Sequence, residues 1–223
     1  MRKADGVIMA GGKGSRLGVG EKPLVRVKGR SMIDYVVAAM RQARLVRRVY
    51  AAVSPHTPKT AHHLEKTWRG SVWLIQTLGA GYVEDLRHVA ATLRSPAMLV
   101  CPADMPLLRG DLLDFVVDSF FREGKPSLVV VVPHRMMVDL GLEPSFTMSV
   151  DGEEVVPSGV NVVNGVELAS RETLEESYLK VGIKEFAVNV NTASCLEVAE
   201  KLLPLTRGTR SIGHLPMRKF MKL

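Results

Sequence analysis

Aromatic residues, cysteines and long apolar runs are all scarce in this chain of 223 residues. Only 5% of the residues are aromatic, too few for a platform of stacked nucleic-acid bases to be the first interpretation. The two cysteines, Cys101 and Cys195, lie far apart and predict reduced, buried thiols rather than a disulfide framework. No apolar run reaches the roughly 18 residues that identify a membrane-spanning helix, and the first residues lack the apolar core of a signal peptide. We therefore expect a cytoplasmic protein without a membrane span.

Several common catalytic and nucleotide-binding motifs are also missing. No glycine loop ends in the Lys-Ser or Lys-Thr pair of a Walker A motif, and the pattern that begins at Gly12 has Leu17 where a dinucleotide fingerprint requires glycine. The six histidines show no zinc-site spacing with the cysteines, and no Ser/His/Asp arrangement is apparent. These absences argue against P-loop NTPases, dinucleotide-binding domains, zinc proteins and serine hydrolases.

The chain has few acidic residues for its many basic ones, with a formal net charge of +7 at pH 7. Such a balance can indicate nucleic-acid binding, but no helix-turn-helix, zinc-ligand or mixed aromatic and basic pattern supports it. An anionic small substrate explains part of the charge equally well, so we expect no nucleic-acid partner. From Pro204 the chain carries basic residues and no acid, and we divide it into a domain over residues 1–203 and a basic C-terminal tail over 204–223.

A glycine-rich loop near the start of the chain is its most informative feature. An apolar run from Val7 leads into four glycines within eight residues, and the stretch carries the cations Lys13, Arg16 and Lys22. Glycines let a backbone turn sharply and approach a ligand, and successive N–H groups in such a turn bind anions. The alternative is a glycine-rich surface turn with solvated cations. The phosphate-binding residues predicted from this loop are Ala10, Gly11, Gly12, Lys13, Gly14 and Ser15.

Strand-like and helix-like segments alternate along most of the chain, which predicts an α/β fold with a mostly parallel mixed sheet and helices on both faces. The expected strands are residues 6–10, 46–53, 72–76, 97–101, 128–132, 159–163 and 186–190. The expected helices are residues 32–42, 58–66, 82–93, 112–121 and 194–203. Residues 133–157 have no clear rhythm, and we expect them to be irregular with short strands.

Polar clusters follow several of these strands, and ligands of such sheets bind beyond the carboxyl ends of the strands. The clusters include Ser54, Asp104, and Asn189 with Asn191. Asp104 is well placed to hold Mg²⁺, which prefers oxygen ligands, although it could instead cap the following helix. An amide oxygen of Asn189 or Asn191 could complete the metal site, or both residues could serve the geometry of a turn. The sequence leaves the choice between the two asparagines open.

Residues 78–86 open the helix expected at 82–93 and are candidates for binding the base of a nucleotide. Leu78, Gly79 and Gly81 belong to a stretch whose glycines permit close approach of the backbone to a flat base. Glu84 or Asp85 could accept hydrogen bonds from N1–H and N2–H₂ of guanine, which adenine does not offer. An acidic first turn also suits the helix dipole, and the two interpretations are evenly balanced.

Gly159 and Asn161 form a further candidate site at the expected start of the strand over residues 159–163. A glycine beside an amide side chain could position a nucleotide or an acceptor phosphate. A β-bulge glycine is the structural alternative.

The loop Gly11-Gly12-x-Gly14-Ser15-Arg16-Leu17-Gly18 with Lys22-Pro23 resembles the signature of nucleotidyltransferases that join an NTP to a phosphorylated acceptor. Residues 81–86, 156–163 and 189–192 extend the resemblance to the archaeal adenosylcobinamide-phosphate guanylyltransferases of cobalamin synthesis, over about residues 7–203. The resemblance implies a Rossmann-like fold of the nucleotide-diphospho-sugar transferase type. It also implies GTP as donor, a phosphorylated corrinoid as acceptor, and Mg²⁺ held by Asp104 with a late asparagine.

This resemblance leads to a hypothesis in which Arg16, Lys22 and Asp104 are the catalytic residues. The backbone of residues 11–14 and Arg16 would hold the β- and γ-phosphates, Lys22 the α-phosphate and the entering oxygen, and Asp104 the Mg²⁺. One alternative is a nucleotidyltransferase with another phosphorylated acceptor, such as molybdopterin or a sugar phosphate. Another is a non-catalytic nucleotide- or nucleic-acid-binding protein. The sequence is also compatible with a homodimer.

Overall fold

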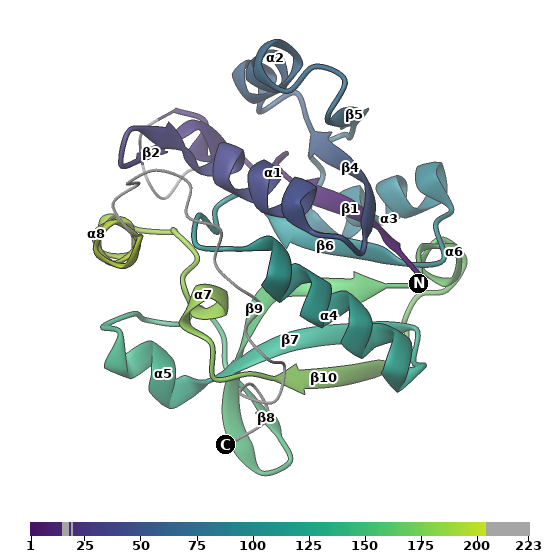
Figure 1. Ribbon diagram of the computed structural model, residues 1–223, viewed down its shortest axis with the longest axis vertical. Helices are drawn as coiled ribbons and strands as arrows, with labels where there is room; N and C mark the ends of the chain where they lie inside the picture. Colours follow the sequence, from purple (N-terminus) through teal and green to yellow (C-terminus); the bar gives the residue numbers. More distant parts are fainter. Residues whose placement is uncertain (15–17, 19, 204–223) are drawn as a thin grey trace.

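An eight-stranded sheet forms the centre of the computed structural model, which describes residues 1–14, 18 and 20–203 (Figure 1). The strands are β1 (Ala4–Met9), β4 (Val46–Val53), β5 (Trp73–Gln76), β6 (Met98–Pro102), β7 (Ser127–Pro133), β8 (Met148–Val150), β9 (Glu153–Val163) and β10 (Glu176–Lys180). Their order is β10-β7-β9-β6-β1-β4-β5, and β8 pairs with β9 outside this path. A separate two-stranded ribbon joins β2 (Arg26–Val27) to β3 (Arg30–Ser31).

The central strand β1 is parallel to its neighbours β4 and β6, whereas β9 is antiparallel to β6 and β7. Successive side chains of a strand point to opposite faces of the sheet. Val7 and Ile8 of β1 are accordingly both fully buried but belong to two different hydrophobic clusters. Because both faces of this strand are covered, its sequence from Gly6 to Met9 is a continuous apolar run. The expected mixed, mostly parallel sheet is confirmed.

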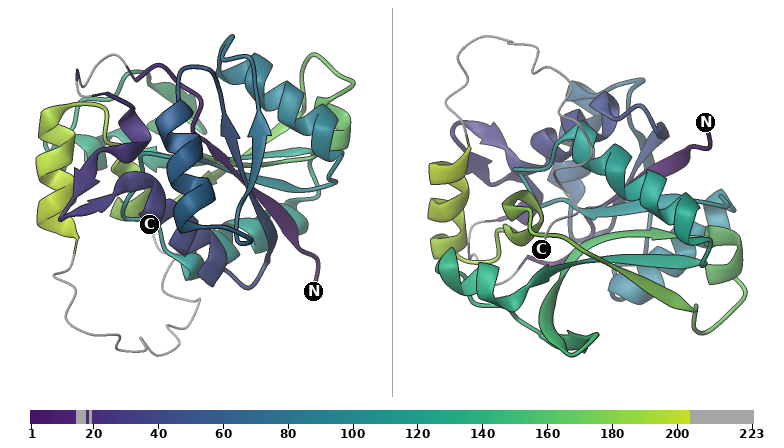
Figure 2. Two further views of the ribbon diagram at one scale, coloured as in Figure 1. Left: turned by 90° about the horizontal axis from the view of Figure 1, so that it is seen from above. Right: turned by 60° about the horizontal axis from the view of Figure 1, so that its bottom comes forward.

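Helices cover both faces of the sheet. They are α1 (Met32–Gln42), α2 (Pro58–Thr67), α3 (Tyr82–Leu93), α4 (Gly110–Glu123), α5 (His134–Asp139), α6 (Gly165–Leu168), α7 (Lys184–Ala187), α8 (Ala193–Leu202) and the 3₁₀ helix η2 (Lys22–Leu24). Figures 1 and 2 show α1 and α4 on the face of the sheet opposite to α3 and α6. Side chains of α1, α2 and α4 belong to the larger hydrophobic cluster, and those of α3 to the smaller one. None of the helices in the described residues is long and apolar enough to span a membrane.

Most expected elements are found close to their predicted bounds. The helices expected at residues 32–42 and 82–93 coincide with α1 and α3, and the strand expected at 46–53 coincides with β4. In each case apolar residues recur with the period of a helix or a strand. These residues pack against the rest of the protein on the face where that period places them. The basic tail over residues 204–223 lies outside the described residues.

The prediction fails at the end of the sheet that lies beyond β9. The expected strand over residues 186–190 is wrong, because Lys184–Ala187 form the short helix α7 and the next residues pair with no strand. Phe186, Ala187, Val188 and Val190 are nevertheless buried, so their apolar side chains serve core packing and not sheet pairing. The strand that does lie there is β10, which pairs in parallel with β7. Residues 133–157 contain α5 and β8, and β9 already begins at Glu153.

Candidate active site

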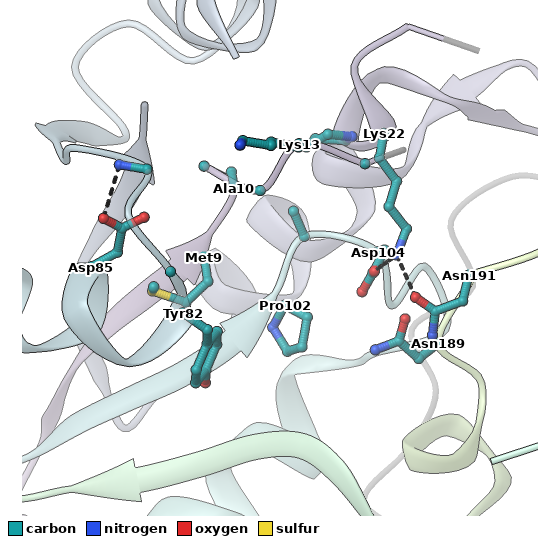
Figure 3. A pocket seen from close by; sticks show the side chains of 17 residues that line it. Met9, Ala10, Lys13, Lys22, Tyr82, Asp85, Pro102, Asp104, Asn189 and Asn191 are labelled. Atoms are coloured by element: carbon teal, nitrogen blue, oxygen red, sulfur yellow. Dashed lines mark hydrogen bonds and ion pairs between the residues drawn. The ribbon is translucent and has the colours of Figure 1, made fainter. Parts of the chain in front are cut away.

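A cavity of about 620 Å³ lies beyond the carboxyl ends of β1 and β6 (Figure 3). Many of the predicted site residues line it: Ala10, Gly11, Gly12, Lys13, Gly14, Lys22, Gly79, Gly81, Asp85, Asp104, Asn189 and Asn191. They come from the loops after β1, β5 and β6 and from the segment before α8. Ser15 and Arg16, for which we expect phosphate contacts, lie outside the described residues. The convergence of distant loops on one rim follows from the parallel direction of the strands.

The first half of the glycine loop is fixed by close contacts with its neighbours. The Ser54 hydroxyl donates to the carbonyl oxygen of Gly11 at 2.6 Å. Gly14 has a φ of +61°, and a Cβ at that position would lie 2.8 Å from the Cβ of Lys22. Glycine is therefore required at Gly14 for both its backbone conformation and its approach to Lys22. Ser54 supports the loop through this hydrogen bond and does not itself line the cavity.

Lys22 is the cation at the centre of the cavity wall. Its Nζ forms an ion pair with Asp104 Oδ2 and donates to Asn191 Oδ1 at 2.7 Å (Figure 3). Pro23 occupies the first turn of η2, where its fixed φ suits the start of a helix. The short helix thus directs the amine of Lys22 to one side chain that follows β6 and to another in the segment before α8.

The residue before Lys22 anchors this segment to α2. The carboxylate of Glu21 accepts hydrogen bonds from the backbone N–H groups of Lys59 at 2.8 Å and Thr60 at 2.6 Å, and from the Thr60 hydroxyl at 2.7 Å. The residue before α2 provides no side-chain cap. Glu21 therefore satisfies N–H groups of the first turn of α2, which have no partner inside the helix.

Asp104 is a buried carboxylate with a free oxygen. Burial raises the pKa of Asp104 above its ordinary value, and the neighbouring Lys22 opposes this rise. Asp104 Oδ1 and Asn189 Oδ1 are both buried and have no hydrogen-bond partner in the part of the chain that the structure describes. Asp104 does not cap α4, which begins after Arg109, whereas Thr192 does cap α8 by accepting from the N–H of Cys195. Two unpaired buried oxygens at one cavity wall are polar groups in need of a ligand.

Asp85 holds the turn at the opposite end of the cavity. Its Oδ1 accepts a hydrogen bond from the N–H of Gly79 at 3.0 Å. Gly79 has a φ of +68°, and a Cβ there would lie 2.7 Å from Cδ2 of His56. Asp85 is buried and lines the cavity, whereas Glu84 is exposed and does not. The geometry thus separates the two acidic candidates that the sequence could not.

Tyr82 lines the cavity with a half-exposed ring and a buried hydroxyl. Burial raises the pKa of Tyr82 to about 12, and a hydrogen bond with Asn161 opposes the rise. Asn161 and Gly159 themselves do not line this cavity. Gly159 has a φ of +87° at a register shift between β7 and β9, and a Cβ there would lie 2.8 Å from Cγ of Pro102. Both residues therefore support Tyr82 and Pro102 from behind.

Five of the predicted nucleotide-binding residues thus do not line the cavity. Ser54, Gly159 and Asn161 contact its wall from behind, Glu84 is exposed and does not line it, and Leu78 is 80% exposed. Gly159 and Asn161 also lie within β9 and not at the start of a strand as expected. Conversely, five residues of the wall were not predicted as site residues, although each lies in or beside a predicted motif: Met9, Pro23, Tyr82, Pro102 and Ala103.

Comparison with known proteins supports the resemblance of the motifs. A family model described as the MobA-like NTP transferase domain matches residues 6–212. An adenosylcobinamide-phosphate guanylyltransferase of Methanocaldococcus jannaschii is 34% identical over 206 residues, which cover 89% of this chain and 97% of that protein. A probable molybdenum cofactor guanylyltransferase of Thermococcus kodakarensis is 26% identical, over 90% of this chain and 94% of its own length.

Solved structures with low sequence identity share the fold. A CMP:2-keto-3-deoxy-manno-octonic acid synthetase complexed with CTP has a TM-score of 0.71 at 17% identity, and the match covers 90% of this chain and 98% of that one. A putative glucose-1-phosphate thymidylyltransferase from Bacillus anthracis has a TM-score of 0.68 at 15% identity, over 89% of this chain and 94% of that one. The expected fold of the nucleotide-diphospho-sugar transferase type is confirmed. With the family match and the nearly full-length relative, this shows that the chain belongs to the MobA-like NTP transferase family of nucleotidyltransferases.

Proposed function

We propose that this nucleotidyltransferase transfers GMP from GTP to adenosylcobinamide phosphate, with release of pyrophosphate. The observation that carries the proposal is the alignment with the adenosylcobinamide-phosphate guanylyltransferase of M. jannaschii, which spans nearly the whole of both chains at 34% identity. The cavity agrees with such a reaction, because it combines a glycine loop, a cation and a buried carboxylate. The relative with a molybdenum-cofactor name is less similar, at 26% identity.

In the proposed reaction an oxygen of the acceptor phosphate attacks the α-phosphorus of GTP. The new P–O bond forms as the bond from the α-phosphorus to the β-phosphate oxygen breaks, and pyrophosphate leaves with that electron pair. Negative charge grows on the leaving group, so the enzyme needs positioned donors and cations more than a nucleophile of its own. We assign the backbone of residues 11–14 and Arg16 to the β- and γ-phosphates. We assign Lys22 to the α-phosphate and the entering oxygen.

The wall around Asp104 also suits Mg²⁺. Asp104 Oδ1 and Asn189 Oδ1 are buried oxygens without partners among residues 1–14, 18 and 20–203, and oxygen is the ligand that Mg²⁺ prefers. No group of three His, Cys, Asp or Glu side chains that could hold a metal occurs among the described residues. Most ligands would therefore come from phosphates and water, as is usual for Mg²⁺. When bound, the ion would neutralise charge on the phosphates. Asp104, Asn189 and Asn191 are the residues we assign to it.

We assign the turn at residues 79–81 and Asp85 to the base. A carboxylate can accept from both N1–H and N2–H₂ of guanine, while adenine presents an acceptor at N1 and repels it. Asp85 is buried and already bonded to the N–H of Gly79, so its position is fixed before a ligand arrives. A homodimer and a cytoplasmic location remain predictions from the sequence.

Pyrophosphate release by the purified protein tests this function. GTP or ATP is offered with Mg²⁺, together with adenosylcobinamide phosphate, molybdopterin, a sugar phosphate or no acceptor. Release only with GTP and the corrinoid would support the proposal. Release with GTP and another acceptor would retain the guanylyl transfer and refute the corrinoid. Binding of nucleotide without release with any acceptor would favour a protein that only binds nucleotides.

A further inference from the structure

A second cavity, of about 240 Å³, adjoins the first and shares Asn189 and Asn191 with it. Its walls come from β7, β9, α5, α7, residues 142–146 and the segment that leads into α8, at and beyond the antiparallel strand β9. Most of the wall is apolar and includes Val132, Met137, Phe146 and Phe186. The assignments of nucleotide and phosphate made above leave this cavity unused.

The charges around the second cavity are distributed unevenly. Among the described residues no lysine or arginine lines it, and its one carboxylate is that of Glu143. Such a wall offers no compensation for a buried phosphate, because a buried charge needs an opposite charge or several hydrogen bonds. Lys22 contacts the wall that the two cavities share, because its Nζ donates to Asn191 Oδ1 at 2.7 Å. A ligand spanning both cavities would thus have its phosphate beside Lys22 and its uncharged part among the apolar side chains.

We propose that the second cavity binds the uncharged arm that carries the phosphate of the acceptor, an inference that rests on the function proposed above. Its volume is below the roughly 300–1,000 Å³ of pockets that enclose a whole drug-sized ligand. It therefore admits an arm and not a corrin macrocycle. The macrocycle remains at the mouth, where Phe146 lines the cavity with 64% of its surface exposed.

The same wall discriminates against a polyhydroxylated acceptor. Its buried serine, Ser158, already accepts a hydrogen bond from the N–H of Val160 at 3.0 Å. Hydroxyl groups of a sugar placed among the apolar side chains would lose water without gaining equivalent partners. The cavity is thus a specificity element for the acceptor, whereas the glycine loop and Asp85 serve the nucleotide.

Steady-state kinetics of Phe146→Ala test this inference. The side chain is largely exposed, so its truncation should leave the fold intact. We expect KM for adenosylcobinamide phosphate to rise about tenfold, as for the loss of one apolar side-chain contact, with KM for GTP unchanged. Val166→Ala is the matched control, because Val166 is 48% exposed and lies on α6 at the other face of the sheet. It should change neither constant.

Cobinamide without the phosphate provides a second measurement that needs no turnover. Its binding to the wild-type protein, followed by corrin absorbance, should compete with the acceptor and not with GTP, and Phe146→Ala should weaken it by a similar factor. An active Phe146→Ala variant with unchanged KM for the acceptor and unchanged cobinamide binding would overturn the pocket assignment alone. A wild-type protein that binds cobinamide but releases no pyrophosphate with the corrinoid would overturn the proposed function and support the pocket.

Discussion

Replacement of Glu21 by alanine tests whether α2 holds the catalytic lysine in place. The carboxylate of Glu21 bonds the N–H groups of Lys59 and Thr60 and the Thr60 hydroxyl, at 2.6 to 2.8 Å. It therefore serves α2 as a cap that comes from a distant part of the chain. Lys22 is the next residue, so the same contact fixes the backbone from which the amine of Lys22 reaches the cavity.

The expected size of the effect follows from these contacts. Removal of a capping side chain costs about 0.5–2 kcal/mol of stability. Glu21 is only partly buried, so water replaces some of its bonds, and we expect a loss of about 1 kcal/mol for Glu21→Ala. A displacement of about 1 Å at a reacting centre can cost about a hundredfold in rate. Because Glu21 acts through Lys22, we expect kcat/KM for GTP to fall about tenfold. Glu21→Gln retains one acceptor oxygen and should lie between alanine and wild type.

Thermal unfolding and pyrophosphate release measure the two effects separately. Glu200→Ala is the matched control, since Glu200 is an exposed carboxylate with a single backbone contact, from the N–H of Lys28 at 3.5 Å, and does not line the cavity. It should change neither stability nor rate by a measurable amount. A Glu21→Ala variant that loses stability but keeps its kcat/KM would refute the reasoning. Glu21 would then cap α2 without positioning Lys22.

Three further substitutions probe the cavity wall. Gly14→Ala should lower kcat/KM more than tenfold in the pyrophosphate assay, because its Cβ would displace Lys22; wild-type turnover would contradict the contact. Tyr82→Phe should destabilise the protein by about 1–3 kcal/mol in denaturant unfolding, because the Asn161 side chain, whose Oδ1 already lacks a partner among the described residues, loses its bond to the Tyr82 hydroxyl; an unchanged midpoint would contradict this. Asp104→Asn should lower turnover about a hundredfold without lowering the melting temperature of the metal-free protein at pH 7. Burial raises the pKa of Asp104, so its ionised form opposes folding, a penalty that disappears as the pH falls toward about 4. A large drop in melting temperature at pH 7 would count against this assignment.

The elements that the sequence predicts well are those with local apolar periods. α1 and α3 have helical stripes that are buried against the sheet, and their bounds could be read directly. β10 has the sequence Glu-Ser-Tyr-Leu-Lys, and as an edge strand it is only partly buried. Its pairing with β7 depends on a partner almost fifty residues earlier, and no local pattern records such a partner. The same limit explains the strand wrongly predicted at residues 186–190. Its apolar residues resemble those of a strand, but their burial serves core packing.

The residues of the candidate site likewise divide into those that the sequence predicts and those that it does not. Motif residues at strand ends, such as Gly11, Lys22 and Asp104, were predictable because the direction of the parallel strands brings those ends together. The supporting contacts were not predictable, because they join residues far apart in the sequence. Ser54 with Gly11 and Tyr82 with Asn161 are of this kind. Ser54 and Asn161 were placed in the nucleotide site by their motifs, yet they contact its wall from behind and do not line the cavity.

The two cavities show why the nucleotide is easier to infer from sequence than the acceptor. The first is built from loops after parallel strands, where glycine and charged residues must recur at fixed spacings to hold phosphates. The second is built from β9 and the irregular segments around it, where apolar residues of several kinds can form a wall. A CTP complex with 17% identity still shares the fold at a TM-score of 0.71, so the fold tolerates extensive substitution. Differences in acceptor should therefore be sought first in residues 132–146, which no motif marks.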